Sequence, residues 1–387
     1  MSSTQPTKNA RADATGTGAD VDPVGGPRSE AAVNPSSATI EHARPAGAAD
    51  WARRVLRIQA FQILLVLVVI YLVFTGLAPD TFPGWLNMRQ VVQNVSILAV
   101  LGIGMTYVII TSGIDLSVGS VLVFSGVIAA KAMTAMGGDG WGTAIVGILL
   151  SIACGVAWGL LNGFLIAKAK VPPLIVTLGT LGAALGLAQV ITKGVDIRSV
   201  PTVLADTIGY GNVPGTTIPI ISLIALIFVV VFGVILHKTR FGLYTYAVGS
   251  NEESARRVGV KVDRQLISIY VLSGALAGVG GILSLSQYST TAIAGQSNTN
   301  LNVIAAVVIG GTSLFGGLGT MFGTVVGLFI PAILQNGFVI VGVQPFWQQV
   351  AVGAVLIIAV YIDQRRRASA TRAGGRRSLG ILLRRRT

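Results

Sequence analysis

The stretch SNEESARRVG, Ser250–Gly259, lies in the one sizeable polar island of the chain, His237–Gln265, between two long apolar blocks. Ser250 and Glu253 have the spacing of a capping box, in which each side chain hydrogen-bonds the backbone amide of the other. Gly259 suits the left-handed residue that commonly follows a helix. The stretch therefore predicts a short helix with both ends specified.

The charged residues of this stretch also favour a helix. Glu252 precedes Arg256 by four residues, and Glu253 precedes Arg257 by four. Both pairs stabilise a helix, and both place charge favourably for the helix dipole. A helix this short is marginal alone because nucleation is costly. Two interpretations stay open: a solvated connection between membrane spans, or a rigid polar knob that docks on a soluble partner.

The apolar blocks on either side predict a polytopic membrane protein. Of the 387 residues, 52% are hydrophobic and 11% are charged, which is outside the range of soluble domains. The net charge of +13 is concentrated in arginine runs at 365–367, 376–377 and 384–386. Basic segments that flank membrane spans mark the cytoplasmic side and attract anionic lipid. Membrane lipid, and no nucleic acid, is therefore the expected contact.

A span needs about 20 mainly apolar residues. On that template the all-α fold has about ten transmembrane helices, at 58–78, 91–111, 116–136, 143–167, 173–192, 218–236, 266–288, 301–314, 319–336 and 346–362. Three regions follow: a disordered N-terminal tail at 1–50, a transmembrane permease domain at 51–363 and a basic cytoplasmic tail at 364–387. The Lys/Arg distribution predicts a multi-pass protein of the cell (inner or plasma) membrane with both termini cytoplasmic.

A faint internal repeat relates the two halves. GLLNGFLIAKAKVPP at 159–173 resembles PAILQNGFVIVGVQP at 331–345. Five predicted spans separate the copies, so the second is inverted relative to the first, as in many transporters. Chance similarity between two glycine-rich span ends is the alternative. Glycines at four-residue spacing, such as Gly155, Gly159 and Gly182–Gly186, predict close helix packing.

Two glycine-rich breaks interrupt the apolar runs: GIDLSVGS (Gly113–Ser120) and GGTSLFGGLGT (Gly310–Thr320). Non-helical backbone at membrane depth needs cover from protein or a water-filled cavity. Asp115 is the one carboxylate inside such a break. It either caps the helix predicted to start at Leu116 or belongs to a transport pathway.

The remaining polar groups within the spans are mostly neutral, and no charged residue occurs from Leu266 to Ile362. A pathway of amides and hydroxyls suits a neutral solute such as a sugar, not an ion or a zwitterion. Some of these groups are expected to serve hydrogen bonds between helices instead. The candidate pathway residues are Asp115, Ser117, Asn162, Gln287, Asn298, Asn302, Thr312, Ser313 and Asn336.

The sequence predicts no catalytic, cofactor or metal site. It lacks the G-x-x-x-x-G-K-[ST] loop that cradles a nucleotide phosphate, and its single cysteine and two histidines cannot form a metal site. A proton-driven carrier usually needs buried carboxylates or histidines, and Asp115 alone is little support for one. A separate ATP-hydrolysing subunit is therefore expected to drive transport.

Several blocks together resemble the membrane permease subunit of ribose/xylose-type sugar ABC importers. The resemblance runs from about residue 87 to 362 and rests on GIDLSVGS, NGFLIAKAKVPPLIVTLGT (162–180), FGLYTYAVGSNEESARRVGVKVDR (241–264), VLSGALAGVGG (271–281), AAVVIGGTSLFGGLGT (305–320) and NGF…PFWQQ (336–349). It implies a homodimer, a cytoplasmic ABC ATPase that binds ATP and Mg, an extracytoplasmic sugar-binding protein, and alternating access.

The resemblance also implies that the helix at Ser250–Gly259 is the coupling helix, which sits in a groove of the ATPase. Its residues are Ser250, Asn251, Glu252, Glu253, Ala255, Arg256, Arg257, Val258 and Gly259. Two alternatives remain: a permease of the same superfamily for another small solute such as a branched-chain amino acid, or a stand-alone secondary carrier. The sequence leaves the identity of the sugar open.

Overall fold

The computed structural model describes residues 59–294, 299–344 and 347–354, and isolated positions up to residue 364. The chain divides into two units, and all of these residues belong to the second, Ala49–Thr387. Regular structure within the described residues is helical, apart from one isolated bridge between Asn212 and Pro219. The all-α prediction is therefore confirmed. The predicted tail at 1–50 lies outside the described residues, as does the predicted tail at 364–387 except for residue 364.

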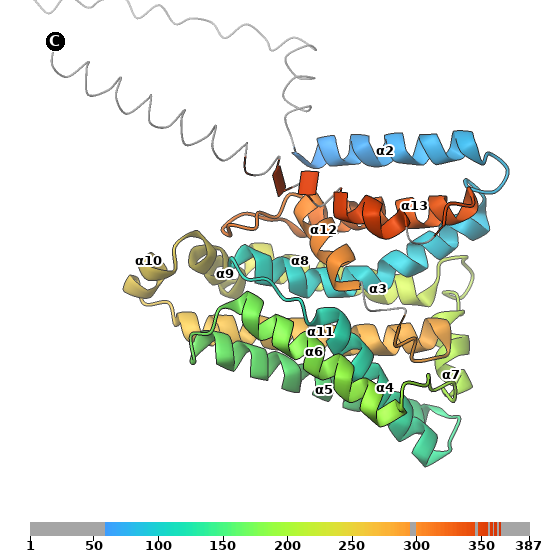
Figure 1. The fold of residues 1–387 in the computed structure, drawn as a ribbon, viewed down its shortest axis with the longest axis horizontal. Helices are drawn as coiled ribbons and strands as arrows, with labels where there is room; N and C mark the ends of the chain where they lie inside the picture. The colour runs from blue at the N-terminus through green and yellow to red at the C-terminus, as the bar shows by residue number, and fades with distance from the viewer. Residues whose placement is uncertain are drawn as a thin grey trace, which may run out of the picture. The chain divides into compact units, whose positions relative to one another are not determined.

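Each of the first nine predicted spans overlaps one helix (Figure 1). The helices in chain order are α2 (Gln59–Leu77), α3 (Trp85–Ile110), α4 (Val118–Met136), α5 (Trp141–Ala167), α6 (Pro173–Thr192), α7 (Thr202–Leu204), η1 (Ala205–Gly209), α8 (Ile220–Lys238), α9 (Arg240–Ser250), α10 (Glu252–Arg257), α11 (Val262–Tyr288), α12 (Thr299–Ile309) and α13 (Met321–Ile340). The tenth predicted span is only partly described, with helix at 347–354.

Seven of the described helices are long and apolar enough to cross a membrane. The eighth predicted span is α12, which has 11 residues. At 1.5 Å per residue it extends about 16 Å, roughly half of a bilayer's apolar core of about 30 Å. The prediction of a span at 301–314 is therefore not confirmed, because the glycine-rich segment after Ile309 ends the helix early.

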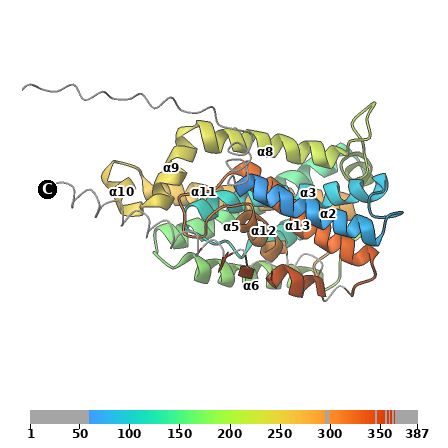
Figure 2. The same ribbon diagram turned by 90° about the horizontal axis from the view of Figure 1, so that it is seen from above.

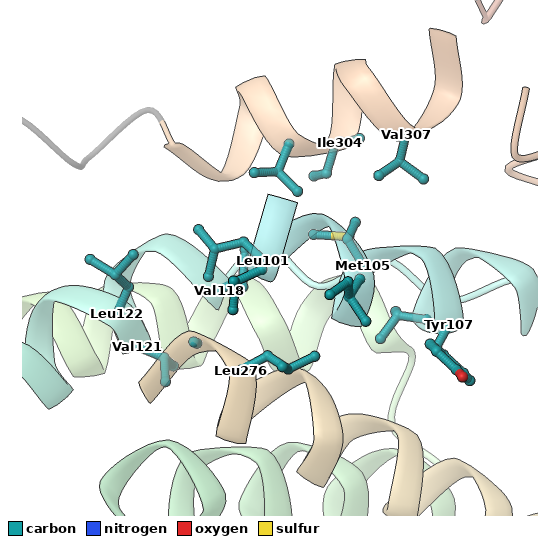
Figure 3. Packing of buried hydrophobic residues seen from close by; sticks show 14 of the residues in the cluster. Leu101, Met105, Tyr107, Val118, Val121, Leu122, Leu276, Ile304 and Val307 are labelled. Atoms are coloured by element: carbon teal, nitrogen blue, oxygen red, sulfur yellow. The ribbon is translucent and has the colours of Figure 1, made fainter. Parts of the chain in front are cut away.

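The core is built where α3 and α11 pack against α4, α5 and α12 (Figure 3). Leu101 and Met105 of α3 and Val307 of α12 are fully buried, and Leu122 of α4 is almost as completely covered. These side chains come from helices far apart in the sequence. Their shared burial fixes α3 and α11 as the centre of the bundle.

Glycine allows α5 and α11 to meet backbone to backbone. A Cβ added at Gly155 would overlap the carbonyl oxygen of Gly274, and one at Gly159 would overlap that of Tyr270. The packing prediction is confirmed for this pair of helices. It is not met at Gly182–Gly186 of α6, where an added Cβ at either glycine has no described atom within 4 Å. That face of α6 is open.

Candidate coupling helix and translocation pathway

The polar island folds as two short helices, α9 and α10, at one end of the bundle (Figures 1 and 2). The N-cap of α10 is Asn251, whose Oδ1 accepts a hydrogen bond of 2.7 Å from the backbone N of Ser254. Ser250 is the last residue of α9 instead. The predicted capping box of Ser250 and Glu253 is therefore wrong. The chain turns one residue later than expected, and Asn caps a helix about as well as Ser.

Both predicted ion pairs of α10 are confirmed. Nη2 of Arg256 lies 3.1 Å from Oε1 of Glu252, and Arg257 pairs with Glu253. Gly259 has the expected positive φ of +88°. These features make α10 a defined helix despite its six residues.

One side of α10 is anchored and the other is free for contact. Ala255 is buried in an apolar cluster with Val248 of α9 and Val262 of α11. Val258 lies 80% exposed just after the helix. Since Glu253 and Arg257 are about three-quarters exposed as well, the outward side of α10 combines a charge pair with an apolar residue.

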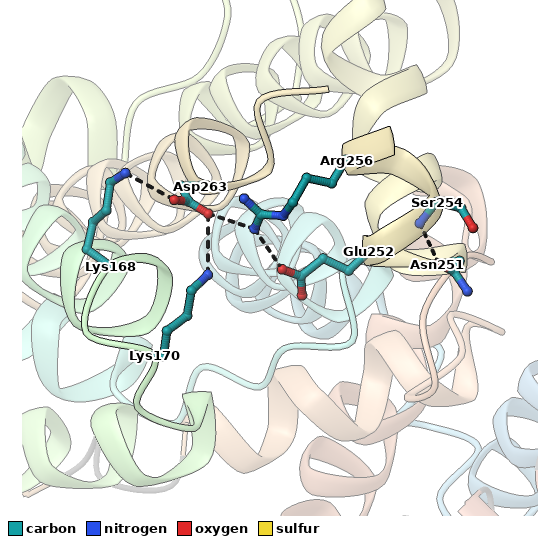
Figure 4. A network of polar contacts seen from close by, with 7 residues as sticks. All are labelled: Lys168, Lys170, Asn251, Glu252, Ser254, Arg256 and Asp263. Carbon is teal, nitrogen blue, oxygen red and sulfur yellow. Dashed lines mark hydrogen bonds and ion pairs between the residues drawn. The ribbon is translucent and has the colours of Figure 1, made fainter. Parts of the chain in front are cut away.

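Asp263, in the first turn of α11, joins this helix to the loop between α5 and α6 (Figure 4). Its carboxylate lies 2.8 Å from Nη2 of Arg256, 3.0 Å from Nζ of Lys168 and 3.3 Å from Nζ of Lys170. The sequence predicted Lys168–Lys170 and the island as separate inner segments. The structure connects them through a carboxylate that was not among the predicted site residues.

The hydrogen bonds to Asp263 and Glu252 raise the pKa of Arg256 above its ordinary value. Arg256 therefore stays charged and shared between both carboxylates at any physiological pH.

The second glycine-rich break meets the end of α3 beside the last turn of α9. The backbone N of Gly317 donates to the carbonyl oxygen of Ile110, the last residue of α3, at 2.8 Å. Ser112 Oγ, just before the first break, donates to the carbonyl oxygen of Phe315 at 2.9 Å. A Cβ at Gly249 of α9 would overlap Ile110. The last turn of α9 therefore contacts both the second break and the segment that leads into the first.

Asp115 is buried in a polar cluster between α4, α5 and α11. Its Oδ1 accepts from the backbone N (3.0 Å) and Oγ (2.6 Å) of Ser117, and its Oδ2 accepts from Oγ of Ser273 (2.9 Å). Nδ2 of Asn162 donates to Ser117 Oγ at 2.9 Å. The N-cap of α4 is Ser117, without a side-chain cap bond. The helix begins at Val118 and not at Leu116, so Asp115 is not its N-cap residue, although it accepts from the backbone N of Ser117 just before the helix and also ties the break to α11.

Other predicted pathway residues gather at the opposite end of the bundle. Asn302 and Asn336 line a cavity of about 370 Å³. Gln287 lies beside it, since its Nε2 donates to Oδ1 of the lining residue Asn94 at 2.8 Å. Asn336 also exchanges two amide hydrogen bonds with Asn87, of 2.7 and 2.9 Å.

Two further pathway candidates lie away from this cavity. Thr312 and Ser313 are buried in the break beside α9 and α10. Asn298 lies outside the described residues. Three further amides that line the cavity, Asn94, Gln335 and Gln348, were not among the predicted site residues, although all are neutral polar residues in apolar spans.

Comparison with known proteins gives the family. The family described as "Branched-chain amino acid transport system / permease component" matches residues 87–360. The ribose import permease protein RbsC of Bacillus subtilis is 39% identical over 301 residues, which cover 77% of this chain and 91% of the relative. This chain belongs to that permease family. No solved structure matches it.

Two further members are similar over the same length. RbsC of Escherichia coli strain K12 is 34% identical, covering 78% of this chain and 93% of the relative. The D-allose transport system permease protein AlsC of the same strain is 32% identical, covering 77% and 90%. The predicted resemblance to sugar ABC import permeases is confirmed. The permease is thus a multi-pass inner-membrane transport subunit and not a catalytic enzyme.

Proposed function

We propose that this permease forms the translocation pathway of an ATP-driven importer for a monosaccharide such as ribose or xylose. The observation that carries the proposal is the amide-lined cavity at one end of a bundle whose other end presents a capped, charged helix. The similarity to permeases named for ribose and allose supports the same class of solute. A branched-chain amino acid is less suitable, since no charged side chain lines the described cavity.

The polar end is the cytoplasmic end in this proposal, and α10 is the coupling helix of an ABC ATPase that binds ATP and Mg. Ala255 holds the helix to the permease, while Glu253, Arg257 and Val258 face the partner. ATP-driven closure of the ATPase pair moves α10, and the contacts of Gly317 and Ser112 pass the movement to both breaks. Each ligand shifts this equilibrium only by its differential affinity for the two states.

The complete architecture belongs to the same proposal: a permease domain at 51–363 of about ten helices in two inverted halves, both termini cytoplasmic and a basic tail inside. Packing supports the inverted repeat. A two-fold relation that superposes 159–173 on 331–345 requires α5 to contact α11 as α13 contacts α3, and both contacts occur.

The assembly consists of two copies of the permease, the ATPase and an extracytoplasmic sugar-binding protein. The open glycine face of α6 supports the homodimer, because small residues let helices pair closely in membranes. Chemical cross-linking of the purified complex tests the copy number.

Co-purification from the native membrane tests the proposal as a whole. A tagged permease should bring down a P-loop ATPase and a sugar-binding protein. A permease that purifies without an ATPase, and whose uptake collapses with the proton gradient, would establish a secondary carrier instead.

A further inference from the structure

The cavity opposite α10 is lined by neutral polar groups from several helices. Its lining residues with polar side chains are Asn94, Tyr288, Thr299, Asn302, Gln335, Asn336 and Gln348. They come from α3, α11, α12 and α13 and from the helical segment that follows α13. We propose that this cavity is the subsite where the permease first receives the sugar, with Asn302 and Gln335 contacting its hydroxyl groups. The inference rests on the proposed sugar transport and adds the residues that hold the substrate.

Its position follows from three helices. Asn94 precedes Ile110 by 16 residues of α3, about 24 Å along the helix at 1.5 Å per residue. Tyr288 ends α11, about 37 Å along the helix from Asp263 near its start. Gln335 lies near the end of α13, whose N-cap Thr320 closes the break beside α9. All three place the cavity at the end that faces the sugar-binding protein when α10 faces the ATPase.

The chemistry of the lining matches a sugar. Each carboxamide offers two donors and an acceptor, and each sugar hydroxyl both donates and accepts. The lining mixes polar and apolar surface, with Ile97, Leu98 and Val339 among its apolar members. A volume of about 370 Å³ lies within the usual range of small-molecule sites.

Two hydrogen bonds hold part of this lining in place before a ligand arrives. Oδ1 of Asn94 accepts from Gln287 Nε2 (2.8 Å) and from Tyr288 Oη (3.3 Å). Oε1 of Gln287 is buried and has no partner among the described residues. In contrast, no side-chain hydrogen bond to Asn302 or Gln335 is found in the described part of the chain. These two amides are therefore available to a ligand, as is Gln348, a further lining amide without a side-chain hydrogen bond among the described residues.

A second cavity, of about 310 Å³, lies at the α10 end and has a different character. Lys170 and Glu252 line it, together with Pro172 and Pro173 at the start of α6. Fixed charges of both signs suit contact with a protein better than recognition of a neutral sugar. The neutral cavity is therefore the better receiving site.

Cysteine labelling tests whether sugar occupies the neutral cavity. The chain has one cysteine, so Cys154→Ser gives a cysteine-free background. Gln335→Cys and, as matched control, Thr217→Cys in the exposed loop before α8 are purified in the full importer complex. A small membrane-impermeant thiol reagent should label both from the outside. Sugar-loaded binding protein should slow labelling at 335 more than sugar-free binding protein does, and leave 217 equal under both conditions.

Transport by isosteric variants supplies the second measurement. Asn302→Leu and Gln335→Met should each lower uptake of a preferred sugar from the panel D-ribose, D-allose, D-fructose and L-arabinose by roughly 3- to 10-fold, as for one lost hydrogen bond. ATP hydrolysis stimulated by the loaded binding protein should remain. Thr217→Val, in the exposed loop before α8, should transport normally.

Normal uptake by both cavity variants, or labelling at 335 that ignores the sugar, would overturn the subsite. Failure of the unaltered complex to take up any of the four sugars would overturn the proposed function itself. That measurement precedes the variants, so the two failures are distinguishable.

Discussion

Replacing Asp263 by Asn should uncouple the permease from its ATPase without unfolding it. The carboxylate is the only described group that bonds Arg256 of α10 and both Lys168 and Lys170 of the α5–α6 loop. Asn keeps the shape and one acceptor oxygen but loses the charge. The expected result is an α10 that is still helical, through Asn251 and its own ion pairs, but no longer held against the loop.

The magnitude follows from the exposure of the partners. The three basic side chains are 47–59% exposed and Asp263 is 21% exposed. Pairs of this kind contribute about 0.2–1 kcal/mol each, and pairs that share one carboxylate do not add fully. The loss is therefore about 1–2 kcal/mol, which changes the population of the attached arrangement about 5- to 30-fold. This is too little to unfold the bundle.

The assay is ATP hydrolysis by the reconstituted importer, stimulated by loaded binding protein, at low and at high salt. Asp263→Asn should lose most of the stimulation, and raised salt should weaken the unaltered complex in the same direction because exposed pairs are screened. Asp139→Asn is the control. Asp139 lies between α4 and α5, and two hydrogen bonds from Thr202 hold the pKa of its carboxyl below its usual range. Full stimulation of Asp263→Asn at both salt concentrations would refute the role of this network.

Three further results are expected. The double reversal Arg256→Glu, Arg257→Glu should abolish ATPase pull-down at normal permease abundance; undiminished pull-down would make α10 a solvated connection. Gly317→Ala should strongly lower permease abundance or transport, because Gly317 has a φ of +73° and an added Cβ would clash with α9. Gly215→Ala is the control: Gly215 has a φ of +75° but lies in open space, so the change should lower stability by only about 1–2 kcal/mol. Equal abundance and transport of the two variants would contradict a packed break. In thermal unfolding, Asp115→Ala should destabilise the permease by about 1–3 kcal/mol more than Asp115→Asn, because Ala leaves two buried hydroxyls without an acceptor. Equal melting temperatures of the two variants would argue against the polar cluster around Asp115.

Much of the fold could be predicted because hydrophobicity and length determine which segments cross a membrane. The predicted span at 173–192 matches α6 at both ends. The helix at the predicted span 301–314 is shorter than expected for a local reason. Its apolar composition continues past Ile309, but Gly311 adopts a positive φ of +93° that ends the helix. The apolar composition of a segment does not reveal such a backbone turn.

The candidate site was predicted less completely, since its contacts join distant segments. The ion pairs of α10 are local and were visible as four-residue spacings. The bond of Asp263 to Lys168 spans 95 residues, and that of Asp115 to Ser273 spans 158. No spacing rule connects such residues. The neutral pathway residues could be recognised by residue type. Which of them lie at which end of the bundle could be seen only in the folded structure.

The driving force of uptake tests the central claim most directly. Vesicles that contain the permease, its co-purified ATPase and binding protein are loaded with ATP or with a non-hydrolysable analogue, and uptake of a labelled monosaccharide is followed with and without a proton uncoupler. The account predicts uptake that requires hydrolysable ATP and survives the uncoupler. Uptake that proceeds without ATP and stops with the uncoupler would contradict it.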